Sequence, residues 1–328
     1  MRFPFNAYLL APLAAFTASF LALPVWRRVC VRIGLVDDPG HRKIHATTTP
    51  LAGGLAVATA LLLPVAAGWL ALQFRLLDPR AVELLSYGFG RRKGELCSIL
   101  AGAVGMLAVG VWDDWKELKP GAKFAGQICI ALLVAAGGVR ITLFVNNILF
   151  SYAITLLWIL TVTNAFNFMD NMNGLCAGLG AIGALWFGGI AVVSGQYLVA
   201  LLALMTLGAL AGFLPHNFPK AVSFLGDGGS QLVGYLMAVL AILPHFYTRF
   251  HPRAYAVLTP LLVLAVPLGD LAWVVVLRTR AGRPFYVGDT NHLSHRLTRG
   301  GLSRERAVLA IWLLSLAAGG FGFLLDRL

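Results

Sequence analysis

Residues 148–194 read ILFSYAITLLWILTVTNAFNFMDNMNGLCAGLGAIGALWFGGIAVVS, two long apolar runs joined by the polar segment 164–174. Runs of roughly 20 apolar residues cross the hydrocarbon core of a membrane as helices, because only a helix satisfies its own backbone there. The same alternation of apolar runs and short polar connections continues along the whole chain. It predicts an all-α integral membrane protein.

Composition agrees with this fold class. Of the 328 residues, 59% are hydrophobic and only 12% are charged, and the mean hydropathy is +0.79. This leaves too little polar surface to cover a soluble globule. We expect about ten transmembrane helices in a single polytopic domain spanning residues 1–328. Their approximate ranges are 5–25, 51–72, 96–112, 124–138, 148–163, 174–194, 197–214, 229–247, 255–277 and 306–325.

Nearly all the side chains that could do chemistry lie in five short segments, which occupy every second gap between the apolar runs. The segments are 37–45, 112–123, 164–174, 224–230 and 289–296. A chain that crosses the membrane at each run would place all five on one face. The loops that contain them hold 16 of the 26 Lys and Arg residues, which predicts that this face is cytoplasmic. Segment 75–93, with five basic residues on the other side, argues against that orientation.

The net charge of +12 does not by itself indicate a nucleic-acid partner. The basic residues adjoin the helices, where membrane lipid headgroups and the positive-inside bias explain them, so we expect no nucleic-acid partner. A basic cytoplasmic face would also attract a phosphorylated substrate. The four cysteines have no metal-binding spacing and are interpreted as packing residues.

Asp113 and Asp114 lie at the foot of the third apolar run, with Lys123 following them. Paired carboxylates at a membrane boundary can hold a divalent metal, or one can act as a base while a lysine neutralises the other. A solvated helix end explains the same pattern. Both interpretations are open for this segment taken alone.

Segment 164–174 carries five Asn and Asp side chains, among them Asn164, Asn167, Asp170 and Asn173. Side-chain carbonyls with a carboxylate suit a hard cation such as Mg²⁺, or a nucleobase. Helix capping is the alternative, although caps rarely need so many residues.

The last two segments suit phosphate. Asp227 stands between glycines at the start of a hydrophobic run, where a helix N-terminus can meet a phosphate or a metal–phosphate complex, although a turn has the same residues. His292, His295 and Arg296 form a cluster that could bind an anion through charge-assisted hydrogen bonds.

In combination and in this order, the segments resemble a family. The chain is similar to the polyprenyl-phosphate N-acetylhexosamine-1-phosphate transferases of glycosyltransferase family 4, and most similar to the branch that makes undecaprenyl-pyrophosphate GlcNAc. The resemblance covers about 85% of the chain. It rests on the following matching positions: Gly34, Asp37, Pro39, Arg42, Lys43, His45, Pro50, Gly53, Gly54, Asp113, Asp114, the NAFNxxD and FxGD motifs, and the His-rich loop before the last helix.

The resemblance implies an activity. The family transfers a sugar 1-phosphate from a UDP-N-acetylhexosamine to a polyprenyl (undecaprenyl) phosphate, releases UMP, and uses Mg²⁺, with Mn²⁺ as an alternative. For this chain it implies a plasma-membrane (inner-membrane) enzyme that initiates a cell-envelope glycan from the cytoplasmic face. Flat apolar helix faces would permit a homodimer without requiring one.

The resemblance also implies roles for residues. Asp227 and Asn167 match metal contacts, and Asp113 matches the acid that deprotonates or orients the lipid phosphate, with Asp114 beside it as a second catalytic candidate. The remaining candidates bind substrate, through the uracil ring or the phosphates: Lys43, Lys123, Asn164, Asp170, Asn173, Phe224, His292, His295 and Arg296.

Two departures from the family pattern stand out. Residues 170–174 read DNMNG where bacterial relatives usually have DGxDG, and Ser294 replaces a histidine of the HxHH motif. The shortened histidine run argues against the related phospho-MurNAc-pentapeptide transferases. A non-enzymatic transporter is the alternative from another class, but it predicts ionisable residues in the middle of spans and a repeat between halves.

Overall fold

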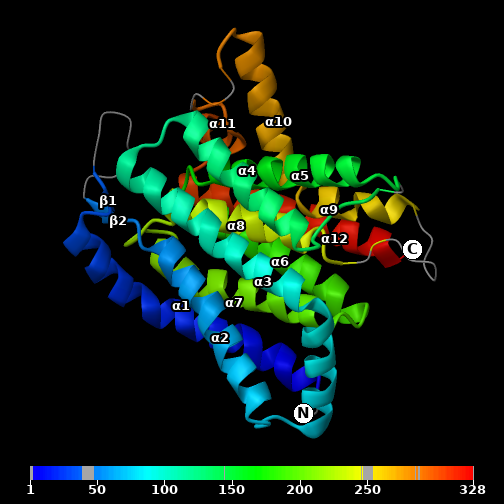
Figure 1. Cartoon of the computed structure of the whole chain (residues 1–328). Helices are drawn as coiled ribbons and strands as arrows, with labels where there is room; N and C mark the ends of the chain where they lie inside the picture. Colours follow the sequence, from blue (N-terminus) through cyan, green and yellow to red (C-terminus); the bar gives the residue numbers. More distant parts are fainter. Residues whose placement is uncertain are drawn as a thin grey trace.

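The structure is a computed structural model that describes residues 3–38, 48–143, 145–244, 246, 254–284, 286 and 289–327. Helices make up almost all of it (Figure 1). In chain order the elements are α1 (Phe5–Ile33), β1 (Val36–Asp37), β2 (Thr49–Pro50), α2 (Gly53–Gln73), α3 (Pro79–Lys116), α4 (Pro120–Ala136), α5 (Ile148–Met169), α6 (Leu175–Val193), α7 (Tyr197–Asn217), α8 (Gly226–Leu240), η1 (Ala254–Leu258), α9 (Thr259–Val263), α10 (Ala265–Arg280), α11 (Leu293–Arg299) and α12 (Arg304–Arg327).

Each of the ten apolar runs contains helix in the structure. Seven helices among the described residues are long and apolar enough to cross a membrane, and the bent pair formed by α9 and α10 raises this to eight if it is one span. α4 and α8 are shorter, with 17 and 15 residues. A helical, multi-pass membrane protein is therefore confirmed, whereas the number of ten crossings stays a prediction.

The ninth run corrects the expectation of one continuous span over 255–277. The chain bends by 77° between α9 and α10, and α10 projects from the bundle beside α11 (Figure 1). Pro267 in the first turn of α10 has no N–H to donate to the carbonyl of Val263, where α9 ends, and its ring crowds that turn. A continuous helix through this point is therefore disfavoured.

Segment 75–93, expected from its basic residues to be a loop, is a second correction. Most of it is helical, because α3 begins at Pro79. Asp78 caps this helix by accepting hydrogen bonds from the backbone N–H groups of Arg80 and Ala81 at 3.0 and 3.4 Å. Non-helical backbone at Arg92 then bends α3.

The short helix α8 lies at the centre of the bundle and is buried along almost its whole length. Glycines on the neighbouring helices allow α8 to come close. A Cβ on Gly110 of α3 would collide with the backbone carbonyl of Asp227, and a Cβ on Gly54 of α2 would collide with the backbone of Gly229. Gly229, one of the glycines that flank Asp227, therefore serves the packing of helices.

The two strands β1 and β2 form a small ribbon, the only sheet within the described residues. Val36 pairs with Pro50 and Asp37 with Thr49. The Pro50 carbonyl also accepts a hydrogen bond of 3.0 Å from the backbone N–H of Phe224, just before α8. The ribbon therefore ties the first polar segment to the fourth.

Candidate active site

All five polar segments contribute to one cavity of about 1680 Å³. Its lining includes Asp37 and Asp38 from the first segment, Asp113 and Asp114 from the second, Asn167, Asp170, Asn171 and Asn173 from the third, Phe224, Gly226 and Asp227 from the fourth, and Asp289, Thr290, Asn291 and His295 from the fifth. Segments far apart in the sequence thus form one polar site. Lys43, a predicted substrate contact, lies outside the described residues.

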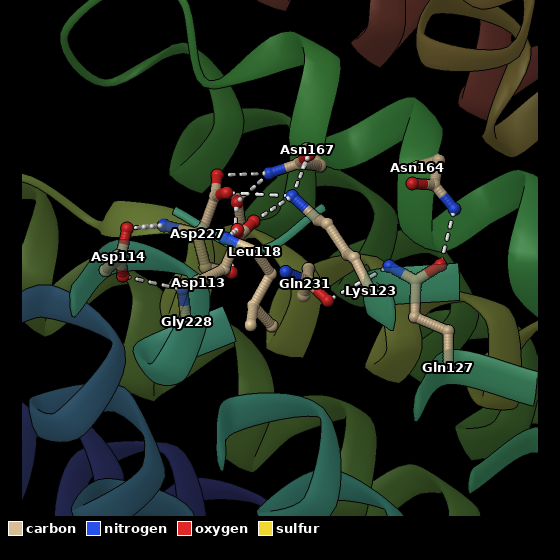
Figure 2. Close-up of polar contacts among 11 residues, drawn as sticks. Asp113, Asp114, Leu118, Lys123, Gln127, Asn164, Asn167, Asp227, Gly228 and Gln231 are labelled. Carbon is tan, nitrogen blue, oxygen red and sulfur yellow. Dashed lines mark hydrogen bonds and ion pairs between the residues drawn. The ribbon is translucent and has the colours of Figure 1, made fainter. Parts of the chain in front are cut away.

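A charged cluster is formed by Asp113, Lys123, Asn167 and Asp227 (Figure 2). All of its members except Lys123 belong to the described lining of the cavity. The Lys123 ammonium is 2.7 Å from Asp113 Oδ2 and 2.8 Å from Asp227 Oδ2. It also donates to Asn167 Oδ1 at 3.2 Å, while Asn167 Nδ2 donates to Asp227 Oδ1 at 2.7 Å. Two carboxylates and an amide therefore share a single cation.

Four helix ends bring these side chains together. Asp113 lies in the last turn of α3, Lys123 in the first turn of α4, Asn167 in the last turn of α5 and Asp227 in the first turn of α8. Asp113 Oδ1 is held by the backbone N–H of Leu118 at 2.9 Å. Because the groups stand on rigid helices, their spacing depends on helix packing.

Asp114 points away from Lys123, although it is the neighbour of Asp113 (Figure 2). Its two carboxylate oxygens accept hydrogen bonds from the backbone N–H groups of Asp227 and Gly228, at 2.8 and 3.0 Å. A carboxylate at a helix N-terminus satisfies otherwise unpaired donors and interacts favourably with the helix dipole. Gly226 begins α8 with φ +73°, and a Cβ there would meet the Asp114 carboxylate at 2.7 Å. This geometry favours a positioning role for Asp114 over the catalytic role predicted for it.

The charged cluster fits a divalent cation, because Lys123 already stands there as a cation among three oxygen atoms. No group of three or more His, Cys, Asp or Glu side chains suited to a metal occurs in the described part of the chain. Mg²⁺ commonly binds through one or two carboxylates and completes its shell with water and phosphate oxygens. Asp227 and Asn167 therefore fit such an ion as a partial ligand set, as their sequence positions predict.

Four of the predicted substrate-binding residues line the cavity: Asp170, Asn173, Phe224 and His295. Burial, together with the nearby carboxylates of Asp227 and Asp114, raises the pKa of Asp170 to about 8. Its neutral form can donate a hydrogen bond. Asn173 Nδ2 donates to the Pro219 carbonyl at 3.1 Å, which orients this side chain at the cavity wall.

Asn164 does not match its prediction as a substrate contact. It is absent from the described lining of the cavity. Its Nδ2 donates to Gln127 Oε1 and to the Leu160 carbonyl, both at 2.8 Å, one turn further from the helix end than Asn167. Asn164 and Asn167 are about one helical turn apart, so the sequence could not distinguish the residue that faces the cavity from the one that faces another helix.

The fifth segment divides in the same way. His295 lines the cavity, and its pKa lies below the ordinary range because of burial and the positive charges of His292, Arg299 and Arg304. His292, by contrast, is buried with its Nδ1 2.7 Å from Asp270 Oδ2 on α10.

Arg296 is exposed, with its guanidinium 5.0 Å from the centroid of the Trp273 ring. Neither His292 nor Arg296 belongs to the described cavity lining, so their contact with phosphate stays a prediction. Residues from Leu293 onward belong to helix α11, and adjacent residues of a helix face different sides, so His295 can face the cavity while Arg296 does not.

The two departures from the family pattern contact each other. Ser294 is fully buried and its hydroxyl donates to Asn171 Oδ1 at 2.6 Å. Asn171 Nδ2 donates in turn to the Phe168 carbonyl at 2.7 Å. These substitutions therefore join α11 to the end of α5 and leave the charged cluster untouched.

Three basic residues that were not singled out from the sequence also line the cavity: Lys220, Arg283 and Arg304. Arg283 and Arg304 flank the fifth segment, so their position close to a motif was the available signal. Asp270 on α10 had no signal, because it is an isolated acid within an apolar run.

These features define an integral membrane protein whose polar cavity is lined by carboxylates, asparagines and basic side chains. The model of the family described as "Glycosyl transferase family 4" matches residues 96–245, which contain the whole charged cluster. The chain belongs to this family, the polyprenyl-phosphate N-acetylhexosamine-1-phosphate transferases.

Curated relatives agree over nearly the whole chain. The probable undecaprenyl-phosphate N-acetylglucosaminyl 1-phosphate transferase of Bacillus subtilis (strain 168) is 30% identical, over 92% of this chain and 81% of that protein. The decaprenyl-phosphate N-acetylglucosaminephosphotransferase of Mycobacterium tuberculosis (strain ATCC 25618 / H37Rv) is 35% identical, over 94% and 80%. The undecaprenyl-phosphate alpha-N-acetylglucosaminyl 1-phosphate transferase of Escherichia coli (strain K12) is 25% identical, over 95% and 81%.

Proposed function

We propose that this chain transfers GlcNAc 1-phosphate from UDP-GlcNAc to a polyprenyl phosphate such as undecaprenyl phosphate, releases UMP, and so initiates a cell-envelope glycan. The names of the relatives favour the GlcNAc branch over the phospho-MurNAc-pentapeptide branch and over a transporter. The observation that carries the proposal is the charged cluster at the cavity to which all five segments contribute.

The reaction brings two anions together. An oxygen of the lipid phosphate attacks the phosphorus that bears the sugar, and the bond to the uridine-bearing phosphate breaks with UMP as the leaving group. Such a transfer depends on holding both groups in line and screening their charges. Bound Mg²⁺, held by Asp227 and Asn167, would supply that screening.

Asp113 is placed to act on the lipid phosphate. Its carboxylate is fixed by the Leu118 N–H at 2.9 Å and by Lys123 at 2.7 Å, so it does not have to reorient to accept a proton or to orient the nucleophile. The Lys123 ammonium, 2.8 Å from Asp227, supplies positive charge beside the proposed metal contacts and would also attract phosphate oxygens.

Other cavity residues suit the nucleotide and its phosphates. Phe224 offers a ring for stacking on uracil, and Asn173 and the neutral Asp170 offer hydrogen bonds. Lys220, Arg283, His295 and Arg304 offer donors to the diphosphate. Lys43 remains a predicted phosphate contact.

We further propose that the chain lies in the plasma membrane (the inner membrane of a cell with two) and crosses it ten times, with the cavity on the cytoplasmic face. The basic residues in 27–43 and 278–306 number 12 of the 26 in the chain, and both segments adjoin the polar segments that form the cavity.

The experiment that tests the proposed function is UMP release by purified protein in detergent, with undecaprenyl phosphate, Mg²⁺ and a panel of UDP-N-acetylhexosamines. Matched reactions omit the lipid or contain EDTA. Release with UDP-GlcNAc that requires both lipid and metal supports the proposal. Release with another sugar alone would correct the donor, and no release from folded protein with any sugar would overturn the activity.

A further inference from the structure

A second polar layer lies beside the charged cluster, on three of the four helices that carry it, α4, α5 and α8. On α4, Gln127 follows Lys123 by one turn, and on α8, Gln231 follows Asp227 by one turn. On α5, Asn164 precedes Asn167 by one turn. Each member is therefore one turn deeper in its helix than a member of the charged cluster, and Figure 2 shows the two layers side by side. We call Gln127, Asn164 and Gln231 the amide layer.

The three amides form a chain of hydrogen bonds between the helices. Asn164 Nδ2 donates to Gln127 Oε1 at 2.8 Å, and Gln127 Nε2 donates to Gln231 Oε1 at 3.0 Å. Gln127 and Gln231 are both 0% exposed. Each bond joins a different pair of helices, α5 with α4 and α4 with α8.

Buried amides constrain their surroundings strongly. An amide removed from water costs free energy unless it is hydrogen-bonded, so the three helices are favoured only at spacings that keep these bonds. The ends of the same helices carry the groups that would bind the metal. Metal affinity depends on ligand spacing, and loss of supporting hydrogen bonds typically lowers it about 10–100-fold.

We propose that Gln127 and Gln231 are positioning residues that set the spacing of the charged cluster for its metal ion, acting through helices α4 and α8. The proposal rests on the proposed function in so far as that function assigns a metal to the cluster. It explains why Asn164, although part of the third polar segment, faces Gln127 and has no place in the described lining of the cavity.

The same helix offers a matched control. Tyr235, one further turn along α8, is also fully buried, and its hydroxyl donates to the Ile99 carbonyl of α3 at 2.9 Å. Removing this hydroxyl breaks one buried bond between helices without touching the amide layer. A purely structural role predicts similar consequences for Gln231→Met and Tyr235→Phe. A positioning role predicts that only Gln231→Met changes the metal site.

The experiment compares wild type, Gln127→Met, Gln231→Met, the double variant and Tyr235→Phe, all purified in detergent. Binding of Mn²⁺ is measured by electron paramagnetic resonance, and the thermal midpoint is measured on the same samples. We expect each Met variant to raise the Kd for Mn²⁺ about tenfold, and the double variant to raise it by little more, because the bond between the two residues is lost once. For Tyr235→Phe, the Kd for Mn²⁺ should stay within twofold of the wild-type value, although its thermal midpoint should fall about as much as in the Met variants. Where wild type releases UMP, the Mg²⁺ concentration for half-maximal release should shift in parallel.

The proposal is overturned by an unchanged Kd in both single variants, by an equal rise in Tyr235→Phe, or by absence of Mn²⁺ binding in wild type. It is also overturned if both single Met variants fail to fold while Tyr235→Phe folds, because the layer would then be required for folding and not only for positioning. If wild type binds Mn²⁺ with the expected pattern but releases no UMP, the proposed function fails and the positioning role stands.

Discussion

Two regions of the molecule arrange their charged side chains in opposite ways. In the charged cluster, Asp113 and Asp227 share the single ammonium of Lys123, so carboxylates outnumber cations at a cavity wall. In the region we call the α10–α11 clamp, Arg278 lies 3.0 Å from Asp289, and His292 lies 2.7 Å from Asp270. Each acid of the clamp has a basic group of its own beside it. An excess of one charge leaves room for a ligand of the opposite charge, whereas a matched pair holds two elements together.

The largest expected effect comes from neutralising one acid in each of the two regions, Asp227 in the charged cluster and Asp270 in the clamp. Asp227→Asn keeps the shape of the side chain but removes a charge from the metal site, so metal-dependent UMP release should fall about 10³-fold while the protein stays folded. Asp270→Asn makes the same change in the clamp, where it should lower the thermal midpoint but reduce UMP release by less than tenfold. Retained activity in Asp227→Asn would remove this residue from the metal site. A loss of activity in Asp270→Asn as large as that in Asp227→Asn would erase the distinction between the two regions.

The next effect separates the two adjacent acids of α3. Asp113→Asn should lower kcat about 10²-fold, more than it raises the KM for the UDP-sugar, because a base or orienting group acts on the nucleophile and not on the donor. Asp114→Asn should instead lower the thermal midpoint, since its charge no longer caps α8. Steady-state kinetics and thermal unfolding on both variants provide the check. An Asp113 variant in which only KM rises would contradict the assigned role.

Much of the fold could be predicted because apolar runs and polar connections differ so plainly in this chain. The corrections fall where local chemistry overrides hydropathy. Pro267 breaks a run that is otherwise long and apolar enough for one span, and Asp78 with Pro79 starts a helix in the segment between two apolar runs. Hydropathy alone predicts neither the break at Pro267 nor the helix start at Asp78 and Pro79.

The site was predictable as a set of segments but not side chain by side chain. Asn164 and Asn167, or His292 and His295, are the same residue types three positions apart, yet one of each pair lines the cavity and the other bonds to a neighbouring helix. Which side chain faces the cavity depends on the rotation of each helix against its neighbours, and this is set by packing partners distant in the sequence. Gln231 could not be found for the same reason, because a lone glutamine in an apolar run has no partner visible in sequence.

The two histidines sharpen the comparison at a smaller scale. His292→Gln removes the imidazole paired with buried Asp270, so we expect a loss of about 1–3 kcal/mol in stability with a KM close to that of wild type. His295→Gln should affect substrate instead. Because burial and neighbouring positive charges hold the pKa of His295 below its ordinary range, the ring gains its charge only in a more acidic range than an ordinary histidine does.

A charged His295 would attract phosphate, so the wild-type KM for the UDP-sugar should decrease as the pH is lowered through that range, and the decrease should be missing in His295→Gln. The KM measured between pH 5.5 and 8 in both variants gives the answer. If His292→Gln abolished the pH dependence and His295→Gln retained it, the assignment of the two rings would have to be exchanged.

The smallest expected effect concerns Asn173, the residue where the chain departs from the aspartate usual in bacterial relatives. Its Nδ2 donates to the Pro219 carbonyl at 3.1 Å, and an aspartate carboxylate cannot make that bond. The side chain is partly exposed, so water can replace the lost partner, and Asn173→Asp should cost only about 1 kcal/mol, or about fivefold in the KM for the UDP-sugar. The control is Asn173→Ala, which loses every polar contact of the side chain and should raise the KM further. A complete loss of UMP release in Asn173→Asp with normal folding would show that position 173 requires a neutral side chain. Activity would then depend on the charge of a residue in the nucleotide-binding wall as well as on the charges of the charged cluster.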